Sequence, residues 1–357
     1  MIIFLGPLPP PLHGFSAINS KMLELIEARS PTMVFNRSRS TSRFGIYELQ
    51  LFIRFVGSIF GTKSKSLYMG LSGGWGQLLD APFVAIALAF KIRIFVHHHS
   101  FAYLNSPTFL SRIIMFALRK SDHIVLCSVM ADSLVDSYKI NSSHIHVLSN
   151  AAFLETTSVS DSRCRAPGTP LTIGFLSNIT AEKGIFTFFE TLQSLRDNRV
   201  LFNAVIAGPV SIEIQRQFDE QLSMASDVRH VGSVYDAAKT EFFADLDLLL
   251  FPTQYANEAE PVTLWEAMAS GVPIVTLQRG CIKTMVPVGA GVVVAEVAEF
   301  ARTVVAEVRA LHDDPAHLLK RREAAKVAVE QARKQSALAL DLLLANITDS
   351  VRPGKST

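Results

Sequence analysis

Two series of short apolar runs, each alternating with longer amphipathic stretches, constrain the fold of this 357-residue chain more than any other feature. The runs lie at 1–5, 66–71, 92–98, 123–128 and 145–150 in the first half, and at 171–177, 201–208, 228–233, 247–253, 272–277 and 291–295 in the second. Short continuous apolar strands separated by helices are typical of parallel sheets that helices cover on both faces. The pattern therefore predicts an α/β chain with two doubly wound, Rossmann-like domains.

The segment 155–170 separates the two series, because it is polar, contains Gly and Pro and has little periodicity. We expect an N-terminal domain over 1–160 and a second domain over 161–335. A helical tail runs from about 297 to 346, and its last part, 336–357, is expected to pack back on the first domain. Two such domains would face each other across a cleft at the carboxyl ends of their strands, where open α/β sheets bind ligands.

Composition excludes several classes of protein. The net charge of +2 is too small for a nucleic-acid binder, and the three cysteines lack the C-x-x-C spacing of a zinc site. The longest apolar run, 81–90, is too short for a membrane-spanning helix, which needs about 20 residues. A charged fraction of 18% and a mean hydropathy of +0.28 indicate apolar surface outside the cores. We expect a cytoplasmic protein, with peripheral contact to the inner face of the membrane left open.

The stretch 257–275, NEAEPVTLWEAMASGVPIV, places Glu258 and Glu266 eight residues apart. A loop is expected up to Pro261, which has no N–H and suits the first turn of a helix. The backbone N–H groups that follow it lie unpaired at a helix N-terminus, which is a ready phosphate site. These N–H groups belong to Val262, Thr263 and Leu264.

This stretch resembles the E-x7-E motif of GT-B fold glycosyltransferases, especially the retaining enzymes of family 4, also called glycosyltransferase group 1. The resemblance implies that Glu258 binds hydroxyls of the donor sugar and that Glu266 accepts from the ribose of its nucleotide. Carboxylates suit both tasks because they accept strong hydrogen bonds. The family often has E-G-F-G here, so Glu260 is a further acid near the sugar. The alternative is that all three are solvated surface acids.

A second resembling segment is GFLSNITAEKGI, residues 174–185. The family pattern is a strand, G-R-L, and then E-K-G, in which the Arg and Lys neutralise the donor diphosphate. Lys183 matches the lysine, whereas Asn178 stands in the place of the arginine. One cation is therefore missing, and loss of a cation from a dry site weakens leaving-group stabilisation. The alternative for Lys183 is an ordinary surface lysine.

Weaker signals follow from placement in the resembling fold. The loop at 6–19 ends in His13-Gly14 before a helix, and Gly14 would approach the donor phosphates and the acceptor. Gly208 ends a strand that faces the cleft. The loop after 231–233 would hold the base near Val234 and Tyr235. For the first of these loops, the alternative is a tight turn without a ligand.

Three histidines end one strand, at 97–99. Alternation along a strand points His97 and His99 to one side and His98 to the other, which argues against a shared metal. In the family, a histidine at this strand end faces the sugar or the acceptor. The H-x-S pattern with Ser100 selects His98, and His99 is the fallback. The alternative is that the histidines are packed or hydrogen-bonded locally.

The sequence Asp245-Leu246-Asp247 spells D-x-D, which binds a divalent metal in the other glycosyltransferase fold. Here it immediately precedes the apolar run LLLF, so we interpret Asp247 as a structural residue at the start of a buried strand. No metal and no other cofactor are expected.

The segment 43–65 is aromatic and basic, with apolar residues at helical spacing. These residues are Phe44, Leu51, Phe52, Phe55 and Ile59, and Arg43, Arg54, Lys63 and Lys65 surround them. Such a helix can lie in a lipid headgroup layer, or it can pack one face into the first domain. The pattern does not decide between these two placements.

The resemblance covers nearly the whole chain and is most specific in the second domain. It implies a retaining glycosyltransferase whose second domain binds the donor and whose first domain binds the acceptor. The enzyme would move a sugar from a nucleotide-diphosphate sugar to a hydroxyl of a lipid-linked or polysaccharide acceptor, in the synthesis of cell-surface polysaccharide or glycoconjugate. Three alternatives stay open: a nucleotide-sugar epimerase, a non-catalytic nucleotide-sugar binder or scaffold, and a structural membrane-associated protein.

Overall fold

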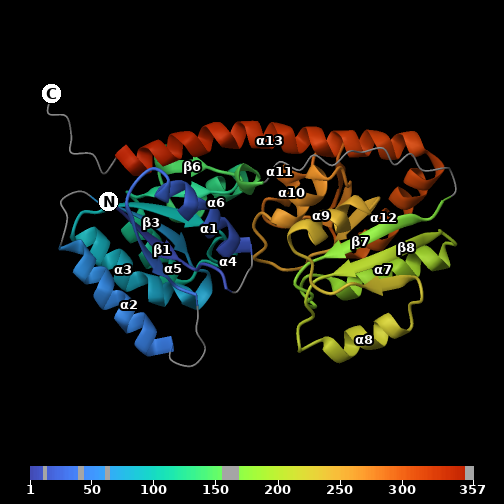
Figure 1. Cartoon of the computed structure of the whole chain (residues 1–357), viewed down its shortest axis with the longest axis horizontal. Helices are drawn as coiled ribbons and strands as arrows, with labels where there is room; N and C mark the ends of the chain where they lie inside the picture. Colours follow the sequence, from blue (N-terminus) through green and yellow to red (C-terminus); the bar gives the residue numbers. More distant parts are fainter. Residues whose placement is uncertain (11–13, 39–43, 61–64, 155–168, 350–357) are drawn as a thin grey trace. The chain divides into compact units, whose positions relative to one another are not determined.

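The computed structural model describes residues 1–10, 14–38, 44–60, 65–154 and 169–349 (Figure 1). The chain forms two compact units, unit 1 over 1–153 and 334–357 and unit 2 over 154–333. Most of the expected linker, together with His13, Arg43 and Lys63, lies outside the described residues. None of the helices over the described residues is both long enough and apolar enough to cross a bilayer.

Unit 1 contains a six-stranded parallel sheet in the order β2-β1-β3-β4-β5-β6. Its strands are β1 (Ile2–Gly6), β2 (Thr32–Asn36), β3 (Ser66–Leu71), β4 (Arg93–His98), β5 (Asp122–Val125) and β6 (Ile145–Val147). Its helices are α1 (Gly14–Glu27), α2 (Phe44–Ile59), α3 (Gln77–Ala89), α4 (Ala102–Asn105), α5 (Phe109–Leu118) and α6 (Ser128–Tyr138). The strand β2 was not predicted, because this edge strand is only partly buried and its apolar run is three residues long.

The two faces of the sheet in unit 1 are covered by different helices. On one face, the strands pack against α1 and against the last turns of α13 (Pro315–Asp349), through Leu343, Leu344 and Ile347. On the other face, the ring of Phe35 in β2 contacts Phe55 of α2, and Phe55 contacts Phe83 of α3. The helix α3 also packs against α5, so α2, α3 and α5 form one layer.

Unit 2 contains a second six-stranded parallel sheet, in the order β12-β11-β10-β7-β8-β9. Its strands are β7 (Leu171–Leu176), β8 (Phe202–Ala207), β9 (Val228–His230), β10 (Leu248–Phe251), β11 (Ile274–Leu277) and β12 (Gly291–Val294). Its helices are α7 (Ile185–Asp197), α8 (Gln215–Ser223), α9 (Asp236–Ala244), α10 (Val262–Ala269), α11 (Ile282–Met285) and α12 (Val297–Asp313). Each predicted run of the second half contains one of these strands, and the predicted fold class is confirmed.

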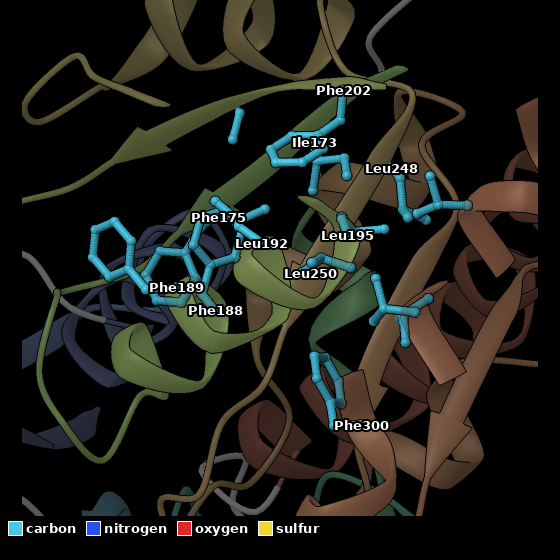
Figure 2. Packing of buried hydrophobic residues seen from close by; sticks show 14 of the residues in the cluster. Ile173, Phe175, Phe188, Phe189, Leu192, Leu195, Phe202, Leu248, Leu250 and Phe300 are labelled. Atoms are coloured by element: carbon cyan, nitrogen blue, oxygen red, sulfur yellow. The ribbon is translucent and has the colours of Figure 1, made fainter. Parts of the chain in front are cut away.

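The core of unit 2 lies between its sheet and the helices α7 and α12 (Figure 2). Figure 2 shows Phe175 of β7 close to Phe188 and Phe189 of α7, and Phe300 of α12 belongs to the same cluster. Burial of each such side chain contributes about 1.5–3 kcal/mol to stability. This packing fixes β7 and α7, and therefore the loop between them.

The C-terminal helical tail differs from its prediction as one helix. It breaks at Asp314, which has an extended backbone at φ −128° and ψ 92°. Pro315 causes the break, because its ring disfavours a helical conformation in the preceding residue and it has no N–H to continue the hydrogen bonds. The carboxylate of Asp314 then accepts from the N–H of Ala316 and starts α13.

Candidate functional site

Glu258 lies in the loop between β10 and α10, at the carboxyl end of the sheet in unit 2. It is only 7% exposed. Its Oε2 accepts from Lys183 Nζ at 2.6 Å and from Thr253 Oγ1 at 3.0 Å. The Lys183 ammonium also lies 4.9 Å from the ring centroid of Tyr255, which adds a cation–π contact. The structure therefore brings together two predicted site residues that are far apart in the sequence.

Backbone contacts join the loop that carries Lys183 to the loop that carries Glu258. Gln254 N donates to Glu182 O at 2.8 Å. Gly184 has φ +85°, and a Cβ at this position would lie 2.0 Å from Pro252 O. Only glycine fits here, because it tolerates positive φ and leaves room for the neighbouring carbonyl. The ion pair is thus held by the main chain and does not depend on side-chain contacts alone.

The helix α10 begins at Val262, one residue after Pro261, which is the N-cap residue and not a first-turn residue. Leu264 N donates to Pro261 O at 3.1 Å, so the predicted set of three unpaired N–H groups is reduced. The N–H groups of Val262 and Thr263 remain at the helix N-terminus. Unpaired N–H groups and a helix dipole can attract an anion, and here they lie next to the loop that contains Glu258.

Glu266 lies one turn along α10 from Val262 and therefore on the same side of the helix. Its Oε1 accepts from Nζ of Lys239, on α9, at 2.7 Å. Both side chains are partly exposed to solvent. Lys239 was not predicted as a site residue, because nothing in the sequence around it distinguishes it from a surface lysine. The contact places a second cation beside the E-x7-E segment.

The remaining predicted donor residues of unit 2 lie at the same sheet edge. Gly208, directly after β8, has φ +127°, and a Cβ there would lie 1.8 Å from Ser177 O in the loop after β7. Asn178 follows Ser177 and is exposed. Val234 lies in the loop that leads to α9 and is half-buried. Glu260 is buried, at 6% exposure.

Asp247 of the D-x-D sequence is fully engaged in structural contacts. Its Oδ2 accepts from Thr172 N at 2.8 Å, and its Oδ1 accepts from Arg322 Nη2 at 2.9 Å. These contacts attach α13 to the start of β10. Among the described residues, no group of three or more His, Cys, Asp or Glu side chains is arranged to hold a metal ion.

In unit 1, His98 at the end of β4 is completely buried. Its Nε2 lies 3.0 Å from Nδ1 of His123, and its Nδ1 lies 2.7 Å from the hydroxyl of Tyr103. His123 Nε2 lies 3.1 Å from Leu118 O, which can only accept, so this nitrogen carries the proton of the neutral ring. It follows that His98 Nε2 donates to His123 Nδ1 and that Tyr103 donates to His98 Nδ1.

This network corrects the selection of His98 as the histidine that faces the substrate. Both of its ring nitrogens are used inside unit 1, whereas His99 points to the other side and is half-buried. The His99 ring contacts Phe15 of α1, with centroids 4.4 Å apart and the rings tilted by 31°, and it contacts His97 at 4.0 Å and 44°. The geometry favours the fallback, His99. Gly14 begins α1, and a Cβ there would meet no atom within 4 Å.

We expect acid to destabilise unit 1. Burial lowers the pKa of His123 from 6.5 to about 4, and burial also holds the pKa of His98 well below its usual value. The unfolded chain therefore binds protons first as pH falls below about 6.5, and stability is lost down to about pH 4. At about pH 5, His123 alone accounts for a loss of about 2 kcal/mol.

Scanning calorimetry at about pH 8 and about pH 5 measures this effect. His123→Gln removes the titrating ring and keeps an acceptor for His98. The variant should therefore show a smaller loss of stability between the two pH values. An unchanged loss would contradict the assignment to His123.

Comparison with protein families gives an independent result for the same part of the chain. Residues 161–335 match the family described as glycosyl transferases group 1. The chain carries a group 1 glycosyltransferase domain. The match includes the two loops that hold Lys183 and Glu258, and it ends within α13.

Solved structures give the same fold for a larger part of the chain. HepE of Anabaena, crystallised with UDP, is similar at a TM-score of 0.69 and 14% identity over 98% of this chain and 99% of that chain. The lipopolysaccharide outer core galactosyltransferase WaaB is similar at 0.69 and 14% identity, over 97% and 99%. A glycosyltransferase from Rickettsia africae reaches 0.70 at 13% identity, over 99% of each chain. These likenesses establish the GT-B fold.

Two curated relatives are named as colanic acid biosynthesis glycosyltransferases, both called WcaL. The protein of Escherichia coli K12 is 30% identical over 133 residues, which cover 36% of this chain and 33% of the relative. The protein of Salmonella typhimurium LT2 is 28% identical over 153 residues, which cover 39% and 38%. The matched segment thus spans 33% of one relative and 38% of the other.

Proposed function

We propose that this chain is a retaining glycosyltransferase that takes a sugar from a nucleotide-diphosphate sugar held by unit 2. The acceptor is a hydroxyl of a lipid-linked or polysaccharide substrate held by unit 1. The observation that carries the proposal is the Lys183–Glu258 pair, which lies at the carboxyl end of the sheet and next to the N-terminus of α10. The family match to residues 161–335 supports it.

The departing diphosphate needs positive groups that are already in place. Lys183 supplies one charge, and the N–H groups of Val262 and Thr263 supply aligned dipoles. Preorganised groups of this kind act strongly in a site from which water is excluded. Asn178 replaces the arginine of the family pattern and donates a neutral hydrogen bond instead, so this chain relies more on Lys183.

The nucleotide is proposed to bind along α10 and the loop before α9. Glu266 accepts from the ribose hydroxyls, and Lys239 holds its carboxylate in position. The base lies near Val234 and close to Gly208, whose lack of a side chain lets the loop after β7 pass directly beside it. HepE has been crystallised with UDP and with UDP-glucose, so a uridine nucleotide is the first candidate.

The chemistry needs no nucleophile from the protein. Glu258 is bound to Lys183 and Thr253, so we assign it to holding the donor sugar and orienting the lysine. We propose that the acceptor hydroxyl attacks from the face that the diphosphate leaves, and that a phosphate oxygen takes its proton. The configuration at the sugar carbon is then retained.

The acceptor is proposed to be part of a cell-surface polysaccharide or glycoconjugate. The names of the two WcaL relatives assign them to colanic acid biosynthesis, which supports a polysaccharide acceptor. In unit 1, the rings of His99 and Phe15 contact each other at the carboxyl end of β4. A sugar ring can pack against such a surface, so we place the acceptor there.

Nuclear magnetic resonance of reactions with UDP-glucose, UDP-galactose and UDP-N-acetylglucosamine tests the proposal. No acceptor has to be identified, because water takes its place and hydrolyses the donor slowly. From these α-linked donors, the first sugar released should be the α anomer. Release of the β anomer would contradict retention. Binding without release or transfer would instead identify a non-catalytic binder, and interconversion of the intact donors would identify an epimerase.

A further inference from the structure

The helix α2 is apolar on two opposite sides. Leu51, Phe55 and Ile59, which the sequence pattern singled out, are buried against the rest of unit 1. They therefore pack into the domain and cannot contact a membrane. A different set, Ile46, Leu49 and Ile53, is turned outward, and each of these side chains is about 60% exposed. A helix that is apolar on all sides is normally covered on all sides.

The neighbouring helix α5 repeats this arrangement. Its inner residues, Ile114 and Met115, are buried, whereas Phe109, Ile113 and Phe116 are exposed at 81%, 50% and 67%. The spacing of four and three residues places these three side chains on one side of the helix. Isolated exposed apolar residues are ordinary, but stripes on adjacent helices of one layer indicate a binding surface.

The helix α3 lies between α2 and α5 and connects the two stripes (Figure 1). Leu78 and Leu88 of α3 are exposed. Beyond the ends of α2 and α3, the exposed rings of Phe60 and Phe90 contact each other edge to face, with centroids 5.3 Å apart. We call the outward side of α2, α3 and α5, with Phe60 and Phe90, the apolar–basic face.

The charges on this face have one sign. The exposed charged residues of the three helices and of the residues that directly follow them are Arg54, Lys91, Arg112, Arg119 and Lys120. The only acids in the three helices are Glu48 and Asp80, and both are turned inward to the buried guanidinium of Arg37. This ion triad also fixes α2 to α3, so the face is a rigid surface.

We propose that the apolar–basic face docks on the surface of a lipid bilayer that contains anionic headgroups. The apolar side chains enter the boundary between headgroups and acyl chains, and the basic side chains pair with lipid phosphates. A second copy of the chain fits less well, because a symmetric contact would oppose basic residues to basic residues. The surface belongs to unit 1 alone, so its binding can be measured without donor or acceptor.

Flotation of the full-length protein with vesicles tests this proposal. The probes are vesicles of phosphatidylcholine alone and vesicles of equal parts phosphatidylcholine and phosphatidylglycerol. We expect binding to the anionic vesicles, and we expect added salt to weaken it. The triple variant Ile46→Gln, Leu49→Gln, Ile53→Gln should lower the partition coefficient at least about tenfold.

The matched control is Leu201→Gln, Ile212→Gln, Val288→Gln, which changes three exposed apolar residues of unit 2 and should leave vesicle binding unchanged. Circular dichroism verifies that both variants are folded. Equal binding of the wild type and the α2 variant, or no binding of the wild type to either vesicle, would overturn the proposal. So would a dimer in solution that the α2 variant abolishes, because a second copy would then cover the face.

Discussion

Replacement of Glu258 by Gln is expected to lower kcat for sugar transfer about 10²- to 10³-fold, the size of effect seen when one preorganised polar group is lost from an active site. Glutamine has nearly the same shape but no charge. It cannot form an ion pair with the Lys183 ammonium, which lies 2.6 Å from the carboxylate in the native protein. Its neutral amide oxygen also accepts more weakly from sugar hydroxyls. The lysine is partly exposed, so water can solvate it and the fold should survive.

The measurement is the rate of donor turnover by Glu258→Gln, with circular dichroism to confirm folding. Glu213→Gln is the control, because it removes an exposed acid in the loop before α8 and should keep full activity. Near-normal turnover by a folded Glu258→Gln protein would remove Glu258 from its proposed role.

Replacement of Gly280 by Ala is expected to abolish most activity through the backbone of Glu258. Gly280 has φ +46°, and a Cβ there would lie 2.1 Å from Glu258 O and 2.8 Å from Ala259 O. The next residue, Cys281, donates its N–H to Ala259 O at 2.9 Å, so the loop cannot move away without losing this bond. The strained backbone alone costs about 1–3 kcal/mol, and relief of the collision displaces the carboxylate.

Gly232→Ala is a matched control for this prediction. Gly232 also has positive φ, at +74°, but a Cβ there meets nothing within 4 Å. The control therefore carries the cost of the left-handed backbone without the collision. Thermal unfolding and donor turnover should both be affected far more by Gly280→Ala than by Gly232→Ala. Equal losses in the two variants would show that contact with the Glu258 loop is unimportant.

The predictable part of the fold is the part that depends on continuous burial. A central strand such as β10 is apolar and buried along its whole length, so it stands out from the flanking helices. The edge strand β2 is half-buried and does not stand out in this way. The break at Asp314 depends on the single proline that follows it. The predicted one-helix tail overlooked that residue.

The candidate site shows a similar division. Lys183 and Glu258 were identified one at a time through resemblance, and only the structure shows that they form a pair. The sequence around Lys239 does not mark it as a site residue. Its contact with Glu266 depends on the packing of α9 beside α10. Alternation along β4 separated His98 from its neighbours, but both His97 and His98 are completely buried, so alternation could not tell which histidine is accessible. The outward stripe of α2 was missed because the helix is apolar on two opposite sides, and the pattern does not show which of them is buried.

Thermal stabilisation by UDP, GDP, ADP and dTDP tests the claim that unit 2 binds a nucleotide diphosphate. A ligand that binds only the native state at a hundred times its Kd adds about 2.7 kcal/mol of stability. We predict a clear rise in Tm with one of the four nucleotides, lost in Glu266→Ala and kept in Glu213→Ala. No rise with any nucleotide, or a rise that Glu266→Ala retains in full, would contradict the donor site described above.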